Sequence, residues 1–295
     1  MKNKALLYVI SGVLVVGIAV GSIFIFSNPT EGSDSVDPEY GAYVYAYTSG
    51  TISKSSKVKL VFANEQIDNE KVGEKVEKDV FSFDPGIQGE SYWEGRRTIA
   101  FKPKEKLPSG QEYNATFSLY KVVDDLPPDM SEFRFSFQTI YQALDISFKG
   151  LRTGSKDLKY VNLEGKIQTA DVVDYEHVKQ IMKAHYQDKT LPVKWTQGSD
   201  KKQYHFRIDS IPRLKNAVGQ LDVEWTGEPL GLEKVNSKTF QIPQRGAFQI
   251  TQLEVGQSPE QHLKVVFSDP LDVGQNFNGL VKIEDGRYFS FIAEN

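Results

Sequence analysis

A short segment occurs three times in this 295-residue chain, each time as an apolar run that leads into a polar turn. The copies read VFANEQID at residues 61–68, IQTADVVD at 167–174 and VVFSDPLD at 265–272. Their last aspartates, Asp68, Asp174 and Asp272, are separated by 106 and 98 residues. The same local text at a nearly fixed period indicates one structural module repeated in series.

The text between the copies alternates apolar with polar residues over short stretches, as half-buried β-strands do. Examples are KVKLVF at 57–62, RTIAFKP at 97–103 and FRFSFQT at 133–139, and turn residues such as PSG at 108–110 separate them. Short strands at regular spacing indicate an all-β sandwich, and a period of about 100 residues is the size of one immunoglobulin-like domain.

We therefore predict an all-β fold of tandem immunoglobulin-like β-sandwich domains. The first domain is expected over residues 42–140 and the second over 141–244. Residues 245–295 contain only the opening half of a module, so we expect an incomplete third immunoglobulin-like domain there.

The second domain contains the only segment with a helical pattern. DYEHVKQIMKAHY, residues 174–186, places Val178, Ile181, Met182 and His185 on one side of a helix. Asp174 is a plausible N-cap, with Glu176 in the first turn. This predicts one short helix between two strands, and Trp195 and Trp225 are expected in the core of the same domain.

The segment LPSGQEY, residues 107–113, is typical of a tyrosine corner. In that device a tyrosine hydroxyl donates to backbone a few residues upstream, here Tyr113, and an apolar residue, here Leu107, lies beneath the loop. The alternative is an ordinary half-buried strand tyrosine.

The N-terminus has the features of a membrane anchor. Residues 5–26 carry no charge over 22 positions, and a helix of that length rises roughly 33 Å, enough to cross a bilayer core. Lysines precede the span and acids follow it, which places residues 1–4 in the cytoplasm and the bulk of the chain in the periplasm or outside the cell. Residues 27–41 read as a linker. A cleaved signal peptide is the alternative.

Composition excludes several kinds of chemistry. The absence of cysteine excludes disulfides, thiolate metal sites and cysteine nucleophiles. A net charge of −4 lacks the basic field that a nucleic-acid partner requires. No motif of a hydrolase, a metalloprotease or a phosphate-binding loop occurs. We therefore expect no enzyme, no cofactor, and no catalytic, cofactor-binding or metal-ligating residue.

A few polar clusters remain as weaker candidates, each with a structural alternative. The histidines His177, His185, His205 and His262 lack metal-site spacing. Asp124–Asp125 and Asp269–Asp272 offer oxygen ligands for calcium but also suit turns. Arg96–Arg97 beside Trp93 is either a binding patch or a solvated strand face. The alternating Tyr43, Tyr45 and Tyr47 are either a ligand platform or, as we favour, core packing.

The order of these modules resembles that of the bacterial alpha-2-macroglobulins. Residues 51–139 resemble a bacterial immunoglobulin-like module through TISKSSKVKLVF, the long run from FSFDPG to YNATF, and FRFSFQT. Residues 160–242 resemble the macroglobulin-like module that follows it, through LEGKIQTADVVDYEHVKQIM, LPVKW, YHFRIDSIPR and LDVEWTGEPLG. LKVVFSDPLDVGQNFNGLVKIEDG resembles the opening of a further module.

The resemblance implies a membrane-anchored protease inhibitor of the cell envelope, whose partners are proteases. In that family a bait region is cut and a Cys–Gln thioester captures the protease in many members. Because this chain has no cysteine, no thioester is present and no capture residue can be assigned to it. Protease contacts are expected through regions beyond this chain. The alternatives are an immunoglobulin-like adhesin or cell-envelope spacer, and an anchored glycan hydrolase whose accessory domains come first.

The anchor prediction is tested by fractionation. Residues 5–26 should hold the protein in membranes during a carbonate wash, because a span of this length inserts as an integral helix. N-terminal sequencing is the control. Release by carbonate, or a mature N-terminus near residue 27, would contradict the anchor and favour a cleaved signal peptide.

Overall fold

A computed structural model describes residues 38–153, 158–257, 261–272, 274–276 and 292. The chain divides into two compact units, Met1–Pro38 and Glu39–Asn295, and the description concerns the second. The predicted tail, the span at residues 5–26 and most of the linker lie outside the described residues. The 3-10 helix η1 (Pro38–Ala42) is the first described element. No helix in the described part of the chain is long and apolar enough to span a membrane.

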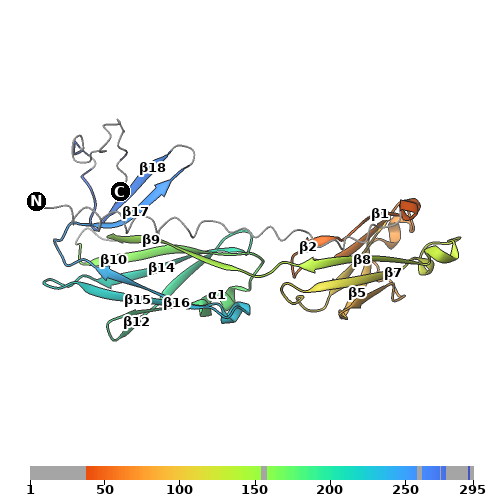
Figure 1. The fold of residues 1–295 in the computed structure, drawn as a ribbon, viewed down its shortest axis with the longest axis horizontal. Coiled ribbons are helices and arrows are strands. Elements are labelled where there is room, and N and C mark those ends of the chain that lie inside the picture. Colours follow the sequence, from red (N-terminus) through yellow and green to blue (C-terminus); the bar gives the residue numbers. More distant parts are fainter. Residues whose placement is uncertain (1–37, 154–157, 258–260, 273, 277–291, 293–295) are drawn as a thin grey trace, which may run out of the picture. The chain divides into compact units, whose positions relative to one another are not determined.

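The first sandwich consists of two four-stranded sheets (Figure 1). One sheet has the order β1 (Val44–Tyr47), β3 (Val58–Phe62), β6 (Thr98–Pro103), β5 (Gly89–Gly95). The other has the order β2 (Gly50–Ile52), β8 (Glu132–Thr139), β7 (Glu112–Ser118), β4 (Phe81–Asp84). In immunoglobulin nomenclature these are strands A-B-E-D and A′-G-F-C. Short 3-10 turns connect the strands, namely η2 (Asn69–Lys71), η3 (Leu119–Lys121) and η4 (Pro128–Met130).

The second sandwich repeats this plan with two changes, one at its first strand and one at β12, an added edge strand. Its sheets are β9 (Leu144–Thr153), β10 (Tyr160–Thr169), β14 (Gln203–Pro212), β13 (Val193–Gln197), and β12 (Lys189–Leu191), β11 (Met182–Tyr186), β15 (Gly219–Thr226), β16 (Val235–Ile242). These are strands A-B-E-D and C′-C-F-G, and η5 (Glu228–Leu230) follows β15. The first strand, β9, stays in one sheet for its whole length.

The predicted third domain, residues 245–295, is described only in part. Strands β17 (Ile250–Gly256) and β18 (His262–Phe267) form a two-stranded antiparallel sheet. The described part of the chain is thus mostly β-sheet, as the sequence predicted.

The cores follow the predicted alternation of apolar residues. In β3, Val58, Leu60 and Phe62 are fully buried while Lys59 is exposed. The ring of Phe62 lies edge-on to that of Phe117 across the sandwich, 5.7 Å between centroids. In the second sandwich, Trp195 and Trp225 are only partly buried, so they lie at the margin of the core rather than inside it.

The predicted helix is shorter than residues 174–186. Helix α1 covers Tyr175–Ile181, and Met182 begins strand β11. The segment 182–186 alternates between buried and more exposed residues and pairs with both β12 and β15. The apolar spacing predicted too long a helix because Val178, Ile181 and Met182 are all buried. The first two belong to the helix, whereas Met182 belongs to the strand.

The tyrosine corner is not formed. Tyr113 is buried and its ring stacks on Phe137 at 5.2 Å, but no hydrogen bond of its hydroxyl is found among the described residues. The buried hydroxyl of Thr139 takes that role, donating to Pro108 O at 2.6 Å while accepting the Gln111 N–H at 2.8 Å.

A tyrosine does tie a loop in the second sandwich. The hydroxyl of fully buried Tyr204, in β14, lies 3.0 Å from Lys201 O, three residues upstream, and 2.8 Å from Val173 O. It thereby links the turn before β14 to the segment that leads into α1.

Tyr204→Phe should lower the free energy of unfolding by about 1–3 kcal/mol, because it leaves the buried carbonyl of Val173 without its donor, whereas Lys201 O keeps the Val173 N–H. Tyr113→Phe is the matched control and should be close to neutral, since the hydroxyl it removes has no described hydrogen bond. Chemical denaturation of both variants measures the difference. Equal costs for the two substitutions would contradict this assignment.

Candidate functional site

The histidines do not converge on one site. His177 is exposed on α1, while His205 and His262 are exposed on β14 and β18. His185, in β11, is half-buried with its Nδ1 atom 3.3 Å from the Thr190 hydroxyl. Across the residues described, no three His, Asp or Glu side chains are grouped as metal ligands would be.

The acidic pairs weighed as calcium ligands have other partners. Asp124 and Asp125 are exposed in a turn where Asp125 has a φ of 56°. Asp272 accepts the Gly274 N–H at 3.0 Å, as a turn-forming aspartate does. Asp269 instead binds Arg213, so the last two carboxylates do not share a ligand.

Arg96, Arg97 and Trp93, which were weighed as a binding patch, have separate partners. Arg96 forms an ion pair with Glu65, whereas Arg97 lies over the ring of Tyr45 at 5.2 Å. Trp93 packs on Phe62 instead.

The tyrosines of the first strand do not share a face. The register of β1 shifts between Val44 and Ala46, so Tyr45 is 74% exposed while Tyr47 packs on Phe133. Core packing was therefore the wrong interpretation for Tyr45.

The three repeated segments have a different role, which depends on one acidic position. Three residues before each final aspartate of the repeat stand Glu65, Asp171 and Asp269. In the second and third copies this acid is bound by groups of the preceding module. The joints between consecutive modules are therefore the candidate functional site.

At the first joint the carboxylate of Asp171 is almost completely buried, with the residue 1% exposed. One oxygen accepts the Ser53 hydroxyl at 2.6 Å, and the other accepts the Lys54 N–H at 2.7 Å. Both donors follow β2 of the first sandwich. The Val172 N–H adds a third bond at 2.7 Å. Three donors satisfy a carboxylate that would otherwise be costly to bury.

The connecting segment is held at the same place. The side chain of Gln142 accepts the N–H of Asp171 at 3.0 Å and donates to its carbonyl at 3.3 Å. Nearby, Lys106 of the first sandwich binds the carboxylate of Asp174, and this hydrogen bond holds the pKa of Asp174 below its usual value. Asp174 therefore stands at the N-terminus of α1 without capping it by its side chain.

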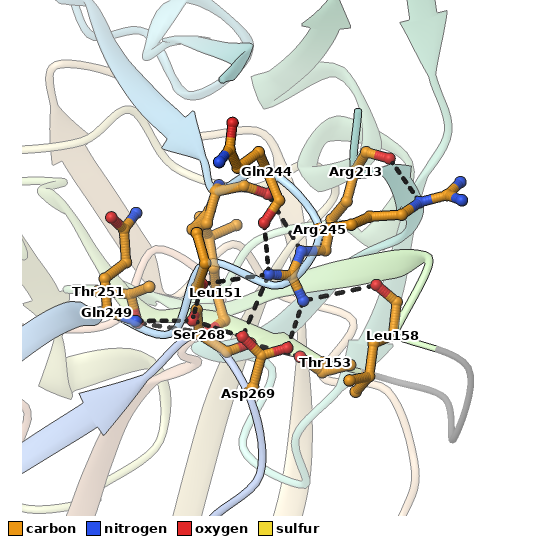
Figure 2. A network of polar contacts seen from close by, with 12 residues as sticks. Leu151, Thr153, Leu158, Arg213, Gln244, Arg245, Gln249, Thr251, Ser268 and Asp269 are labelled. Atoms are coloured by element: carbon orange, nitrogen blue, oxygen red, sulfur yellow. Dashed lines mark hydrogen bonds and ion pairs between the residues drawn. The ribbon is translucent and has the colours of Figure 1, made fainter. Parts of the chain in front are cut away.

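At the second joint the acid binds a buried arginine (Figure 2). The side chain of Arg213, which follows β14, has no exposed surface, and its two terminal nitrogens bind both oxygens of Asp269. The remaining donors reach backbone carbonyls, at 3.1 Å from Nε to Pro243 O and 2.8 Å from Nη2 to Gln244 O. A fork-shaped, permanently charged donor suits this bidentate contact.

Further bonds surround the ion pair. Ser268 Oγ lies 2.7 Å from Asp269 Oδ2 and 2.9 Å from Ala247 O, and it accepts the Gln249 N–H at 3.0 Å. The Thr153 hydroxyl, at the end of β9, donates to Ser268 O. Burial by itself would raise the pKa of Asp269, but hydrogen bonds from Arg213 and Ser268 and the charge of Arg213 together lower it.

The first copy differs from the other two. Glu65 is exposed and forms an ion pair with Arg96 of its own module. The residues that precede its module, 1–37, lie outside the described part. Sequence reasoning located the repeat but missed Arg213 as a functional residue. The available signal was a single arginine in IPRLK directly after an alternating strand.

No protein-family model matches the chain, and no curated protein matches its sequence. Similar solved structures include an L,D-transpeptidase from Mycobacterium tuberculosis H37Rv, with 10% identity, a TM-score of 0.25 and 77% of each chain covered. A chimeric titin tandem carrying a decorin peptide has 10% identity and a TM-score of 0.30, over 68% of this chain and 97% of that one. A tandem of titin immunoglobulin domains has 11% identity and a TM-score of 0.24, over 68% and 93%.

One expectation from the sequence is corrected by these comparisons. We expected that the protein is not an enzyme, yet L,D-transpeptidases are among the structures that resemble it. That expectation is withdrawn. With TM-scores of 0.24 to 0.30, the three structures assign neither a family nor an activity to the chain.

Asp269→Asn should destabilise the second joint by about 3–5 kcal/mol, because it leaves the buried charge of Arg213 unpaired. The expected result is faster hydrogen exchange in β17 and β18 than in the wild type. The pKa of Asp269 is lowered on folding, so its contribution is complete above about pH 4 and is lost as the pH falls below that value. The variant should therefore show a flatter acid dependence.

Asp272→Asn is the matched control, since among the described residues this exposed carboxylate accepts a turn N–H and has no cationic partner. Its exchange rates should stay within about twofold of the wild type, as expected for a surface substitution. An Asp269→Asn variant with unchanged exchange in β17 and β18 would contradict the joint assignment.

Proposed function

We propose that this chain is the membrane-anchored N-terminal portion of an alpha-2-macroglobulin-like protease inhibitor. Its sandwiches serve as a scaffold and binding surface in the cell envelope. The observation that carries this proposal is that the acidic residue three positions before the end of the repeated segment is bound by the preceding module. Asp171 and Asp269 occupy the same position in consecutive copies, and each is bound by the module before it.

Joints that are held by hydrogen bonds and ion pairs suit an inhibitor of this type better than flexible linkers do. A trap must change conformation when its bait is cut, and a change at one module reaches the next only if the two are coupled. Gly/Ser-rich linkers would uncouple the modules. At the second joint, residues 243–247 are instead held against Arg213 by Pro243 O, Gln244 O and Ala247 O.

The anchor and the protease complete the proposal. Residues 5–26 hold the chain in the membrane, with the sandwiches on the far side from the cytoplasm. Proteases are bound through regions beyond this chain. The family resemblance supports this role by the order of the modules, and the absence of cysteine means that capture on this portion is not covalent through a thioester.

The alternative is an immunoglobulin-like adhesin or cell-envelope spacer. Coupled joints favour it as well, since a spacer must resist bending. The two proposals differ in what happens to a protease, because only an inhibitor responds to proteolysis by enclosing the enzyme.

The test uses the protein isolated from native membranes in detergent, mixed with a broad-specificity protease. A trapped protease should retain activity on a small chromogenic peptide and lose most of its activity on a large protein substrate, because the trap excludes large substrates. Heat-unfolded protein is the control and should leave both activities unchanged. Unaltered cleavage of the large substrate by the treated protease would exclude the inhibitor and favour the adhesin or spacer.

A further inference from the structure

The two sandwiches differ at the edge of the last strand, which is β8 in the first and β16 in the second. In the first, β2 leaves the sheet of β1 and pairs in parallel with β8, from Gly50 opposite Phe137 to Ile52 opposite Thr139. The Ile140 N–H also donates to Ile52 O at 2.9 Å. The outer edge of the last strand is therefore partly closed by a segment of the same module.

The second sandwich has no equivalent of β2. Its first strand, β9, pairs with β10 from Leu144 to Thr153 and does not cross to the other sheet. Among the described strands, β16 pairs only with β15, so its other edge is open. An open edge presents a row of backbone donors and acceptors that can pair with another chain.

The residues of β16 whose peptide groups point outward can be identified. The Gly227 N–H donates to Lys234 O at 2.8 Å, which makes this a hydrogen-bonded pair at the start of the ladder. Because hydrogen-bonded and non-hydrogen-bonded pairs alternate in antiparallel sheets, residues 236, 238, 240 and 242 bond to β15. The peptide groups of Val235, Ser237, Thr239 and Gln241 then face away from the sheet.

A groove of about 510 Å³ adjoins the start of this edge. Its apolar lining includes Leu144, Ile146 and Trp225, which are only partly buried against the core, and Val235, which is 72% exposed. The opening between the sheets at β9 and β16 is thus not filled by the described side chains.

The rim of the groove is polar and weakly acidic. Asp145, Glu233 and Lys234 line it and all three are exposed. None of them has an ion pair or side-chain hydrogen bond with another described residue. Two carboxylates and one ammonium leave a local excess of negative charge, which favours a basic side chain in an occupant.

We propose that the open edge of β16 binds an extended segment of a partner polypeptide, which adds to the sheet as a further strand. Strand addition supplies affinity through backbone hydrogen bonds and specificity through side-chain pockets. The segment places an aliphatic side chain in the groove and a basic side chain near Asp145 and Glu233. The first sandwich provides a precedent for pairing at this edge, since β2 pairs with residues 137–139 at the end of β8.

The chain itself supplies a suitable probe. A synthetic peptide of residues 48–57, TSGTISKSSK, contains the β2 sequence with aliphatic Ile52 and basic Lys54. Hydrogen exchange of the full chain is measured by mass spectrometry with and without this peptide. At a peptide concentration of about ten times its Kd, exchange in β16 should slow about tenfold. Exchange in β12, the opposite edge of the same sheet, should not change.

Two matched controls test the mode of binding. Ser237→Pro removes an outward N–H, which proline cannot replace, and should abolish protection by the peptide. Ser237→Ala retains that N–H and should bind normally. A peptide N-methylated at Gly50 and Ile52, the residues whose peptide groups face β8 in the first sandwich, should not protect β16. Unfolding midpoints of both protein variants show whether the second sandwich remains folded.

Several results would overturn the proposal. No slowing of exchange at millimolar peptide would exclude this occupant, and equal protection by the N-methylated peptide would exclude strand addition. Protection of β16 that is present without peptide and independent of protein concentration would assign the edge to a segment of the same chain. Protection that rises with protein concentration, together with dimers in sedimentation, would assign it to a second copy.

Discussion

A carboxylate can be buried between two domains only if hydrogen-bond donors or a cation meet it there. An unpaired ionised group in a low-dielectric site costs several kcal/mol, more than most other single contacts can offset. Asp171 and Asp269 both lie in such sites, and each takes donors from the module that precedes its own. The arrangement of consecutive modules in Glu39–Asn295 therefore depends on where these two acids stand in the repeat.

The two joints satisfy the same requirement with different chemistry. Asp171 is bound by a hydroxyl and two backbone N–H groups, which are neutral dipoles. Asp269 is bound by a guanidinium, so the second joint carries no net buried charge. A buried ion pair is weak evidence for added stability, because replacement by apolar residues is often neutral. The ion pair instead fixes geometry, because the N–H groups of Arg213 also hold the backbone carbonyls of Pro243, Gln244 and Ala247 in place.

The sequence predicted the features that depend on short-range patterns. Alternation identified strands such as β3, and the repeat located the position of the joints. Prediction from the sequence failed where a helical and a strand pattern overlap. Met182 has the spacing of the helix, although it begins strand β11. Prediction also failed where geometry depends on distant residues: Arg213 and Asp269 are 56 positions apart, and the strand shift that exposes Tyr45 has no local signature.

In the third copy the joint to the preceding module is formed although the apolar residues of its strands are not buried in a core. Strands β17 and β18 carry exposed apolar residues, each more than half accessible, namely Ile250, Leu253, Val255 and Leu263, and Phe248 just before β17 is exposed as well. In the two sandwiches the corresponding strands, such as β3 and β10, bury their apolar residues against a second sheet. Nevertheless the bonds from Arg213 and Thr153 to the third copy are complete. The bonds at this joint come from the strand-to-turn segment and also from β17, through Thr251 and Gln252, which bond to carbonyls of β9. These bonds form although the apolar residues of β17 and β18 stay exposed, so the joint does not require a buried face on those two strands.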